Sequence, residues 1–280
     1  MPDKSDGCDM EAAEARTGKR IPADYEASDL SPARFGARSA LVHWFAEISS
    51  TMDAARELAR QGCPHMSLVV AERQSEGRGR LARSWDSREG GLYFTLVTRP
   101  LLPPELAHLV LFTASVSLCC AIRGLYGVEA GLKWPNDVLS GGKKLSGMLS
   151  ELSAEGGRIS YLNMGIGVNV NNDPGSTVAG AVSLKNLLGR AVDRGELLSA
   201  FLDEMDAGLG RMGDGKVMAR WRALAETPGR SVTVATVRET LSGEAIDVDE
   251  DGALLLLLAD GSVTRVLHGD CFHEAPGGKP

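Results

Sequence analysis

Residues 72–85 read ERQSEGRGRLARSW, and a glycine pair at 90–91 closes the stretch. Apolar runs typical of β-strands precede it at 67–71 and follow it at 91–98, so residues 72–91 are predicted to form a loop between two strands of one sheet. Glycine lets the backbone approach a ligand closely, and arginine supplies permanently charged donors shaped for phosphate and carboxylate groups. This arginine loop is either an anion site or a solvated surface loop whose basic charges are balanced by neighbouring acids. Its arginines are Arg73, Arg78, Arg80, Arg83 and Arg88.

The composition indicates a soluble, cytoplasmic protein. With 280 residues, 43% of them hydrophobic and 24% charged, the chain is long enough for one large domain and a small one. The net charge of −7 argues against bulk binding of nucleic acid. Five cysteines without a C-x-x-C pair indicate reduced thiols rather than disulfides or a zinc site. The N-terminal twenty residues lack the apolar core of a signal peptide, and the apolar segment 106–122 is short for a membrane span and is predicted to be a buried helix.

The order of apolar and turn-forming segments predicts three parts. Residues 1–38 are charged and poor in large apolar residues, which favours a flexible tail that ends in a linker. Residues 39–227 predict a mixed sheet with helices packed on it, and residues 228–275 predict a small β-barrel of four short strands. The fold class is therefore α+β. The strands of the first part are expected at 41–45, 67–71, 91–98, 128–133, 145–153 and 159–172, its helices at 52–60, 103–124, 181–188 and 194–224, and the barrel strands at 231–237, 241–248, 253–258 and 263–268.

Four motifs in this order resemble the biotin protein ligases, from about residue 42 to 272. They are GRGR at 77–80 with Trp85 and GLYF at 91–94, then KWPND at 133–137, KKLSG at 143–147 and GIGVN at 165–169. The resemblance implies a catalytic domain similar to class II synthetases and an SH3-like C-terminal domain. It also implies a ligase that forms biotinyl-5′-AMP from biotin and ATP, with Mg²⁺, and transfers biotin to a lysine of a biotin carboxyl carrier domain.

The resemblance assigns roles to particular residues. The catalytic set is Lys144, Arg80, Lys133 and Asp137. The biotin-binding set is Ser50, Thr51, Gln74, Arg78, Gly79, Arg80, Lys144 and Gly147. The ATP- and adenylate-binding set is Arg78, Arg80, Arg83, Trp85, Lys133, Asn136, Gly165, Gly167 and Asn169. No protein motif for a metal is present, so Mg²⁺ is expected to arrive with ATP.

Several of these residues have simpler interpretations. Hydroxyls before a helix are usually N-caps, which is the alternative for Ser50 and Thr51. Asn136 suits a turn as well as a nucleotide, a tryptophan packs in a core as readily as on a base, and paired glycines occur in β-bulges. Only the position relative to the following Leu-Ser-Gly favours Lys144 over Lys143. Met52 stands where the family usually has Asn, and a methionine cannot make the hydrogen bonds of an amide.

Two other functions are kept as alternatives. A lipoate or octanoate protein ligase shares the fold, but its loop carries a Gly-Gly-Gly run that is missing here. A non-catalytic biotin-sensing or nucleic-acid-binding module is disfavoured by the acidic net charge and by the intact Lys133 and Lys144. The region before residue 41 is too short and too polar for the DNA-binding domain of the family's repressor members, so no DNA binding is expected. Sheet edges could support a homodimer.

Overall fold

A seven-stranded mixed sheet forms the centre of the protein. The computed structural model describes residues 28–80, 83–176 and 178–274. Only β1 and β2 pair in parallel, whereas every other neighbouring pair of strands is antiparallel, which confirms the predicted mixed sheet. In spatial order the strands are β1 (Val42–Ile48), β2 (Ser67–Gln74), β3 (Leu92–Thr98), β7 (Arg158–Val168), β6 (Lys143–Glu155), β5 (Asp137–Ser140) and β4 (Gly131–Lys133).

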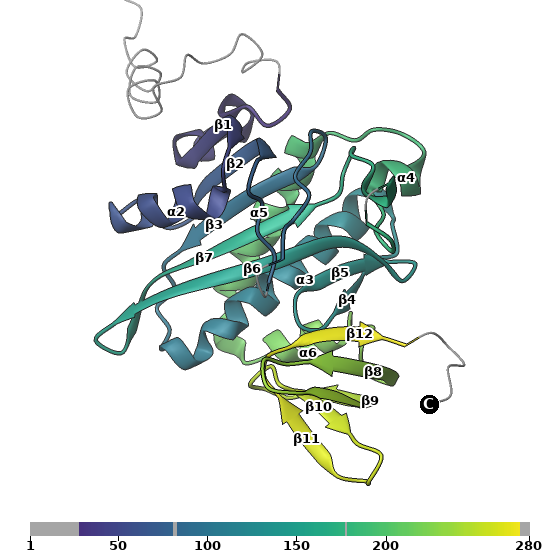
Figure 1. Ribbon diagram of the computed structural model, residues 1–280. Helices are drawn as coiled ribbons and strands as arrows, with labels where there is room; N and C mark the ends of the chain where they lie inside the picture. The colour runs from purple at the N-terminus through teal and green to yellow at the C-terminus, as the bar shows by residue number, and fades with distance from the viewer. Residues whose placement is uncertain (1–27, 81–82, 177, 275–280) are drawn as a thin grey trace, which may run out of the picture.

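The two faces of this sheet are covered differently. The long helices α3 (Ala107–Tyr126) and α5 (Arg194–Gly210) lie together behind it, whereas α2 (Thr51–Arg60) and the arginine loop lie in front (Figure 1). Side chains alternate across a strand, so in β7 Leu162, Met164 and Ile166 enter the main core while Gly165 and Gly167 face the front. The strand therefore has no side chain of its own on the front face at these two positions, which leaves room for side chains from α2 and the arginine loop.

Helix α3 is a core helix, as predicted. The stretch Pro104–Tyr126 is long and apolar enough to cross a membrane, but 56% of its most apolar window is buried inside the protein. It begins after the short 3₁₀ helix η2 (Pro104–Leu106) and ends at Gly127, whose φ of 63° gives a left-handed cap. The other helical segments are η3 (Pro174–Ser176), α4 (Leu184–Leu188), η4 (Met212–Asp214) and α6 (Val217–Arg222).

The C-terminal domain is a five-stranded antiparallel sheet, one strand more than the sequence predicts. Its order is β11 (Val263–Val266), β10 (Leu254–Leu257), β9 (Thr240–Val248), β8 (Arg230–Ala235) and β12 (Asp270–His273). The sequence missed β12 because four residues carry no periodic signal and their partner strand β8 is distant in the chain. Gly252 attaches the domain to the first one: it packs against Phe112 of α3, and its carbonyl accepts from Trp134 Nε1 at 2.9 Å.

The predicted flexible tail is wrong for residues 28–38. They lead into and form most of the 3₁₀ segment η1 (Pro32–Leu41), with Leu30 and Phe35 buried in the main core. Arg38 pairs with Asp203 of α5 at 2.7 Å, and Asp29 pairs with the first residue of that helix, Arg194. Two apolar anchors and a few ion pairs hold this segment despite its polar composition. Residues 1–27, the rest of the predicted tail, lie outside the described residues.

Candidate functional site

A cavity of about 440 Å³ opens on the front face of the sheet, between α2, the arginine loop and the C-terminal domain. Such a volume suits a small-molecule ligand. Every site residue predicted from the sequence lines it: Ser50, Thr51, Gln74, Arg78, Gly79, Arg80, Arg83, Trp85, Lys133, Asn136, Asp137, Lys144, Gly147, Gly165, Gly167 and Asn169. The fold thus gathers into one cavity residues that are spread over 120 positions from 50 to 169.

The arginine loop is an ordered hairpin between β2 and β3. Trp85 N donates to the Gly77 carbonyl at 2.8 Å, and Gly79 N donates to the Arg83 carbonyl at 2.7 Å. A Cβ at Gly77 would lie 2.4 Å from Ser87 Oγ and from the Trp85 carbonyl, so only glycine lets the two arms approach this closely. The hairpin carries the arginines over the front face. Residues 81–82 at its tip lie outside the described part of the chain.

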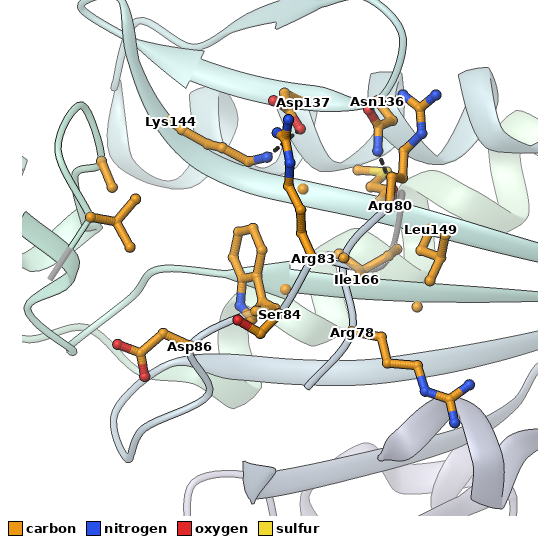
Figure 2. A pocket seen from close by; sticks show the side chains of 18 of the residues that line it. Arg78, Arg80, Arg83, Ser84, Asp86, Asn136, Asp137, Lys144, Leu149 and Ile166 are labelled. Atoms are coloured by element: carbon orange, nitrogen blue, oxygen red, sulfur yellow. Dashed lines mark hydrogen bonds and ion pairs between the residues drawn. The ribbon is translucent and has the colours of Figure 1, made fainter. Parts of the chain in front are cut away.

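The arginines of the hairpin bind different parts of the protein. Arg80 donates to Asn136 Oδ1 and to the Gly269 carbonyl, each at 3.1 Å, and Arg83 pairs with Asp270 at 2.6 Å. Burial lowers the pKa of the Arg80 guanidinium below its usual range, although the charges of Asp270 and Asp137 oppose this shift. Figure 2 shows Arg80 reaching toward Asn136 while Arg78 points the other way. Two arginines therefore join the loop to the C-terminal domain.

Arg78 connects the loop to α2 instead. Its guanidinium bonds to Asp53, which also accepts from Arg56 at 2.7 Å. Arg56 in turn binds Glu151 of β6 at 2.7 Å, so the four side chains form a partly exposed charge network. The sequence predicts ligand contacts for Arg78; the geometry shows its charge already compensated on the helix side of the cavity.

One end of the cavity is lined by hydroxyls and an amide. Gln74 Oε1 accepts from Thr51 N at 2.8 Å and from Thr51 Oγ1 at 3.0 Å, and its Nε2 donates to Ser87 Oγ at 2.9 Å. Thr95 Oγ1 donates to Thr51 Oγ1 at 2.9 Å. Ser50 is the N-cap residue of α2, but its hydroxyl makes no cap bond and is buried without a partner. A buried hydroxyl with no partner is costly, so Ser50 Oγ is available to a polar ligand.

The opposite end carries an ion pair between a lysine and a largely buried carboxylate. Lys144 Nζ lies 2.7 Å from Asp137 Oδ1, and Figure 2 shows the lysine pointing at this carboxylate. Asp137 is 14% exposed, so it gains little compensation from solvent. Lys133 lies opposite Asp137 in the β4–β5 ladder. The neighbouring Lys143 is exposed, so of the two candidates it is Lys144 that lies in the cavity.

Two side chains occupy the space above the glycines of the sheet. A Cβ at Gly167 would lie 2.5 Å from Trp85 Nε1, and one at Gly147 would lie 2.9 Å from Trp85 Cζ3. At Gly165 the added atom would meet Met52 Sδ at 2.8 Å. The glycines were expected to let a ligand approach the sheet, but here they receive Trp85 and Met52. The Trp85 Nε1–H is buried without a hydrogen-bond partner, and Lys144 Nζ lies 5.3 Å from the centre of the Trp85 ring.

The remaining predicted residues support this arrangement. Asn136 is buried, donates to the Met148 carbonyl and accepts from Arg80, so it ties the KWPND motif to both β6 and the loop. Asn169 accepts from Asn172 Nδ2 at 3.0 Å. Trp134 is 1% exposed and belongs to the core. Among the described residues, no group of three or more His, Cys, Asp or Glu side chains could hold a metal ion.

The sequence did not predict three groups that line the cavity. They are the apolar residues Met148, Leu149 and Ile166, the segment 178–181, and Asp270, Cys271 and Phe272 of β12. Strand alternation does not indicate the apolar group, because Met148 and Leu149 are adjacent in β6 and Ile166 lies between the front-facing Gly165 and Gly167 in β7. No local sequence pattern marks the β12 group. Its residues line the cavity because the fold places β12 beside the loop arginines.

A half-buried histidine connects β12 to the KWPND motif. His273 Nε2 lies 3.1 Å from Thr227 Oγ1, which accepts from Trp134 N at 2.9 Å. Burial, together with the charges of Lys133 and Arg230, lowers the pKa of His273 to about 4. The ring is therefore neutral near pH 7, and its Nε2 can accept a hydrogen bond from the Thr227 hydroxyl.

Comparisons with known proteins match both parts of the chain. The Biotin/lipoate A/B protein ligase family matches residues 44–169, and the Biotin protein ligase C terminal domain matches residues 227–274. The bifunctional ligase/repressor BirA of Bacillus spizizenii is 32% identical over 275 residues, which cover 92% of this chain and 83% of that protein. The biotin--[acetyl-CoA-carboxylase] ligase of Paracoccus denitrificans is 34% identical over 221 residues, which cover 75% of this chain and 92% of that protein.

A solved structure agrees with these relatives. The biotin protein ligase of Aquifex aeolicus in complex with biotin and ATP superimposes with a TM-score of 0.70 and 30% sequence identity. The superposition covers 83% of this chain and 98% of that one.

Proposed function

The chain belongs to the biotin protein ligase family, and on that premise we propose that its cavity activates biotin with ATP and then biotinylates a lysine of a carrier domain. In the first step a biotin carboxylate oxygen attacks the α-phosphorus of ATP, which forms biotinyl-5′-AMP and releases pyrophosphate. In the second step the lysine amine attacks the acyl carbon, which forms an amide and releases AMP and a proton. The single observation that carries the proposal is that the polar end, the Lys144–Asp137 pair and the arginine loop all line one cavity.

The first step brings an anion onto a polyanion, so it needs fixed positive charge. Lys144 and Lys133 line the cavity beside Asp137, and the arginine loop adds Arg80 and Arg83. We assign to Lys144 the contact with the biotin carboxylate and the adenylate phosphate, because Asp137 already orients its ammonium group into the cavity. Groups that are oriented before the reaction stabilise developing charge without reorganising.

The second step requires a deprotonated amine. An unperturbed lysine has a pKa of about 10.4 and is protonated at neutral pH. When the adenylate phosphate binds Lys144, Asp137 is released from its ion pair and can accept the amine proton as a general base.

The polar end favours biotin over lipoate. Ser50 Oγ is buried without a partner, next to the Thr51–Gln74 pair. A ureido ring offers donors and an acceptor to these groups, whereas a dithiolane ring offers none. An unsatisfied buried group costs about 1–3 kcal/mol, which corresponds to a preference of roughly 10- to 100-fold.

ATP is the second substrate, and Mg²⁺ is proposed to accompany it. Mg²⁺ is usually held by substrate phosphates and one or two carboxylates rather than by a complete protein cage. The acidic residues that line the cavity, Asp86, Asp137 and Asp270, are each paired with a cation. Bound Mg²⁺ would screen the phosphates, and orientation would come from the lysines and arginines of the cavity.

The partner is proposed to be a biotin carboxyl carrier domain of a biotin-dependent carboxylase, and the location the cytoplasm. We further propose residues 39–227 as the catalytic domain and 228–275 as the C-terminal domain; the two matched families cover residues 44–169 and 227–274. The absence of DNA binding and the homodimer stay predictions; some relatives of similar identity are named ligase/repressors.

The test offers a carrier domain, ATP and Mg²⁺ with either biotin or lipoate and measures the intact mass of the carrier. The expected result is biotinyl mass only, and a lipoylated or unmodified carrier contradicts the proposal. Lys144→Gln is expected to lower the rate about 100- to 1000-fold, as the removal of one oriented charge stabiliser does. The adjacent exposed Lys143→Gln is the matched control and should behave as the parent protein does.

A further inference from the structure

A buried arginine outside the cavity joins both ends of the arginine loop. Arg194 is the first residue of α5, and its side chain is 10% exposed. Its Nη1 lies 2.6 Å from Glu72 Oε2 and 3.1 Å from the Gly91 carbonyl. Glu72 lies two residues before Gln74 at the end of β2, and Gly91 immediately precedes β3. One guanidinium therefore holds the residues at which the loop begins and ends.

The third partner of Arg194 comes from the N-terminal segment. Asp29 accepts from Arg194 N at 2.8 Å and from Arg194 Nε at 3.0 Å. Burial alone would raise the pKa of Asp29, but its hydrogen bonds to Arg194 outweigh burial and hold that pKa below the usual range. Ser28 Oγ adds a bond to Glu72 Oε1 at 2.6 Å. Segment 28–30 thus contacts the same cluster as the loop ends.

The charges make Arg194 necessary for this arrangement. The Arg194 cluster, formed by Asp29, Glu72, Arg194 and the Gly91 carbonyl, holds two carboxylates on one guanidinium. Both carboxylates are largely buried, at 23% and 16% exposure, and without Arg194 they would repel each other. A lysine carries the charge but lacks the planar fork that reaches several acceptors at once.

The loop has a second, weaker set of anchors nearer the cavity. Gln74 bonds to Ser87, and Tyr93 OH donates to the Arg88 carbonyl at 2.7 Å. These contacts fix the loop arms relative to each other, but only the Arg194 cluster connects them to α5 and to the N-terminal segment. Arg78, Arg80 and Arg83 also hold the hairpin from the cavity side, but the Arg194 guanidinium contacts both ends of the loop at once.

We propose that Arg194 is a positioning residue for biotin binding: it fixes both ends of the arginine loop over the cavity, and segment 28–30 reinforces it. The inference rests on the proposed function for its kinetic part, but the structural part concerns the loop alone. Arg194 lies outside the cavity and acts only through the loop.

The first readout is independent of activity. Limited trypsin digestion followed by mass spectrometry reports how fast the loop is cut at Arg78 and Arg83. We expect Arg194→Lys to increase this cleavage about 10-fold, in keeping with the loss of hydrogen bonds to charged groups. Asp29→Asn is expected to increase it less. Arg34→Ala is the matched control, since Arg34 joins the same N-terminal segment to α5 through Asp193 but does not touch the loop.

The second readout is kinetic. For Arg194→Lys we expect the KM for biotin to rise about 10-fold, whereas transfer from preloaded biotinyl-5′-AMP at saturating carrier should be unchanged. If a folded Arg194→Lys protein has the same rate of loop cleavage and the same KM for biotin as the parent protein, the proposal is overturned. The same holds if Arg34→Ala increases loop cleavage as much as Arg194→Lys does. If Arg194→Lys does not fold, Asp29→Asn decides, because unchanged loop cleavage in that variant refutes the role of the cluster. If the parent protein does not biotinylate the carrier domain, the proposed function is refuted, but the cleavage experiment still tests the role of the Arg194 cluster.

Discussion

The free energy of unfolding is predicted to decrease as the pH falls below 6.5, because His273 takes up a proton more readily in the unfolded chain than in the fold. The pKa of a histidine is 6.5 in the unfolded chain and about 4 for His273 in the fold, since burial and the charges of Lys133 and Arg230 disfavour the imidazolium. Between these values the unfolded chain binds a proton that the folded protein does not. The free energy of unfolding therefore decreases as the pH falls from 6.5 to about 4. Below pH 4 His273 is protonated in both states and causes no further decrease.

The size of the effect follows from the two pKa values. From pH 7.5 to 5.0 the linkage relation gives a loss of about 2 kcal/mol for this pair of values. The ring is partly exposed, so solvent screening reduces the expected loss to about 1–2 kcal/mol. The same protonation removes the lone pair that accepts from Thr227, and Thr227 holds the backbone of Trp134 next to Lys133.

The measurement is urea unfolding of the parent, His273→Gln and His268→Gln at pH 7.5, 6.0 and 5.0. Glutamine keeps an acceptor but does not titrate in this range, so His273→Gln should lose this part of the pH dependence. His268 is an exposed histidine of the same domain, and its replacement should leave the parental slope unchanged. A parental slope in His273→Gln would refute the reasoning, because another group would then be responsible.

Three substitutions in the cavity have distinct expected outcomes. Gly167→Ala places a methyl group 2.5 Å from Trp85 Nε1, so we expect the ring to be displaced, which a change in tryptophan fluorescence and a higher KM for ATP would report. Met52→Asn is expected to lower the melting temperature, because the buried methionine loses its packing. The new amide should tighten biotin binding about 2- to 10-fold. An unchanged or weaker biotin affinity, measured by titration calorimetry, would contradict this. Arg80→Ala removes bonds to the KWPND motif and to the C-terminal domain, so the bound adenylate should dissociate faster; a parental half-life would show that the loop does not retain it.

Prediction from the sequence was most successful where the signal was local or carried by a motif. The alternation and turn residues around β2, β3, β6 and β7 were sufficient to predict the mixed sheet. Prediction failed where a segment is held in place by residues far away in the sequence. Residues 28–38 look like a linker by composition, but Asp29 and Arg38 are held by residues of α5 more than 160 positions away.

The sequence by itself determined which charged residues and glycines of the four motifs belong to the cavity. Its four motifs supply the residues for an anion-binding loop, a lysine pair and a glycine-lined sheet, and all of them line one cavity. Residue types and spacing suffice for this because each motif lies on a strand or at its end.

Only the tertiary structure decided what each charge contacts. Arg78 bonds to α2, whereas Arg80 reaches a carbonyl 189 residues away in the C-terminal domain. The sequence left two alternatives for the arginine loop, a solvated loop and an anion site. In the fold this loop is a hairpin held at both ends by Arg194. Ion pairs and side-chain packing act through space, so their partners follow from the fold and leave no pattern in the neighbouring sequence.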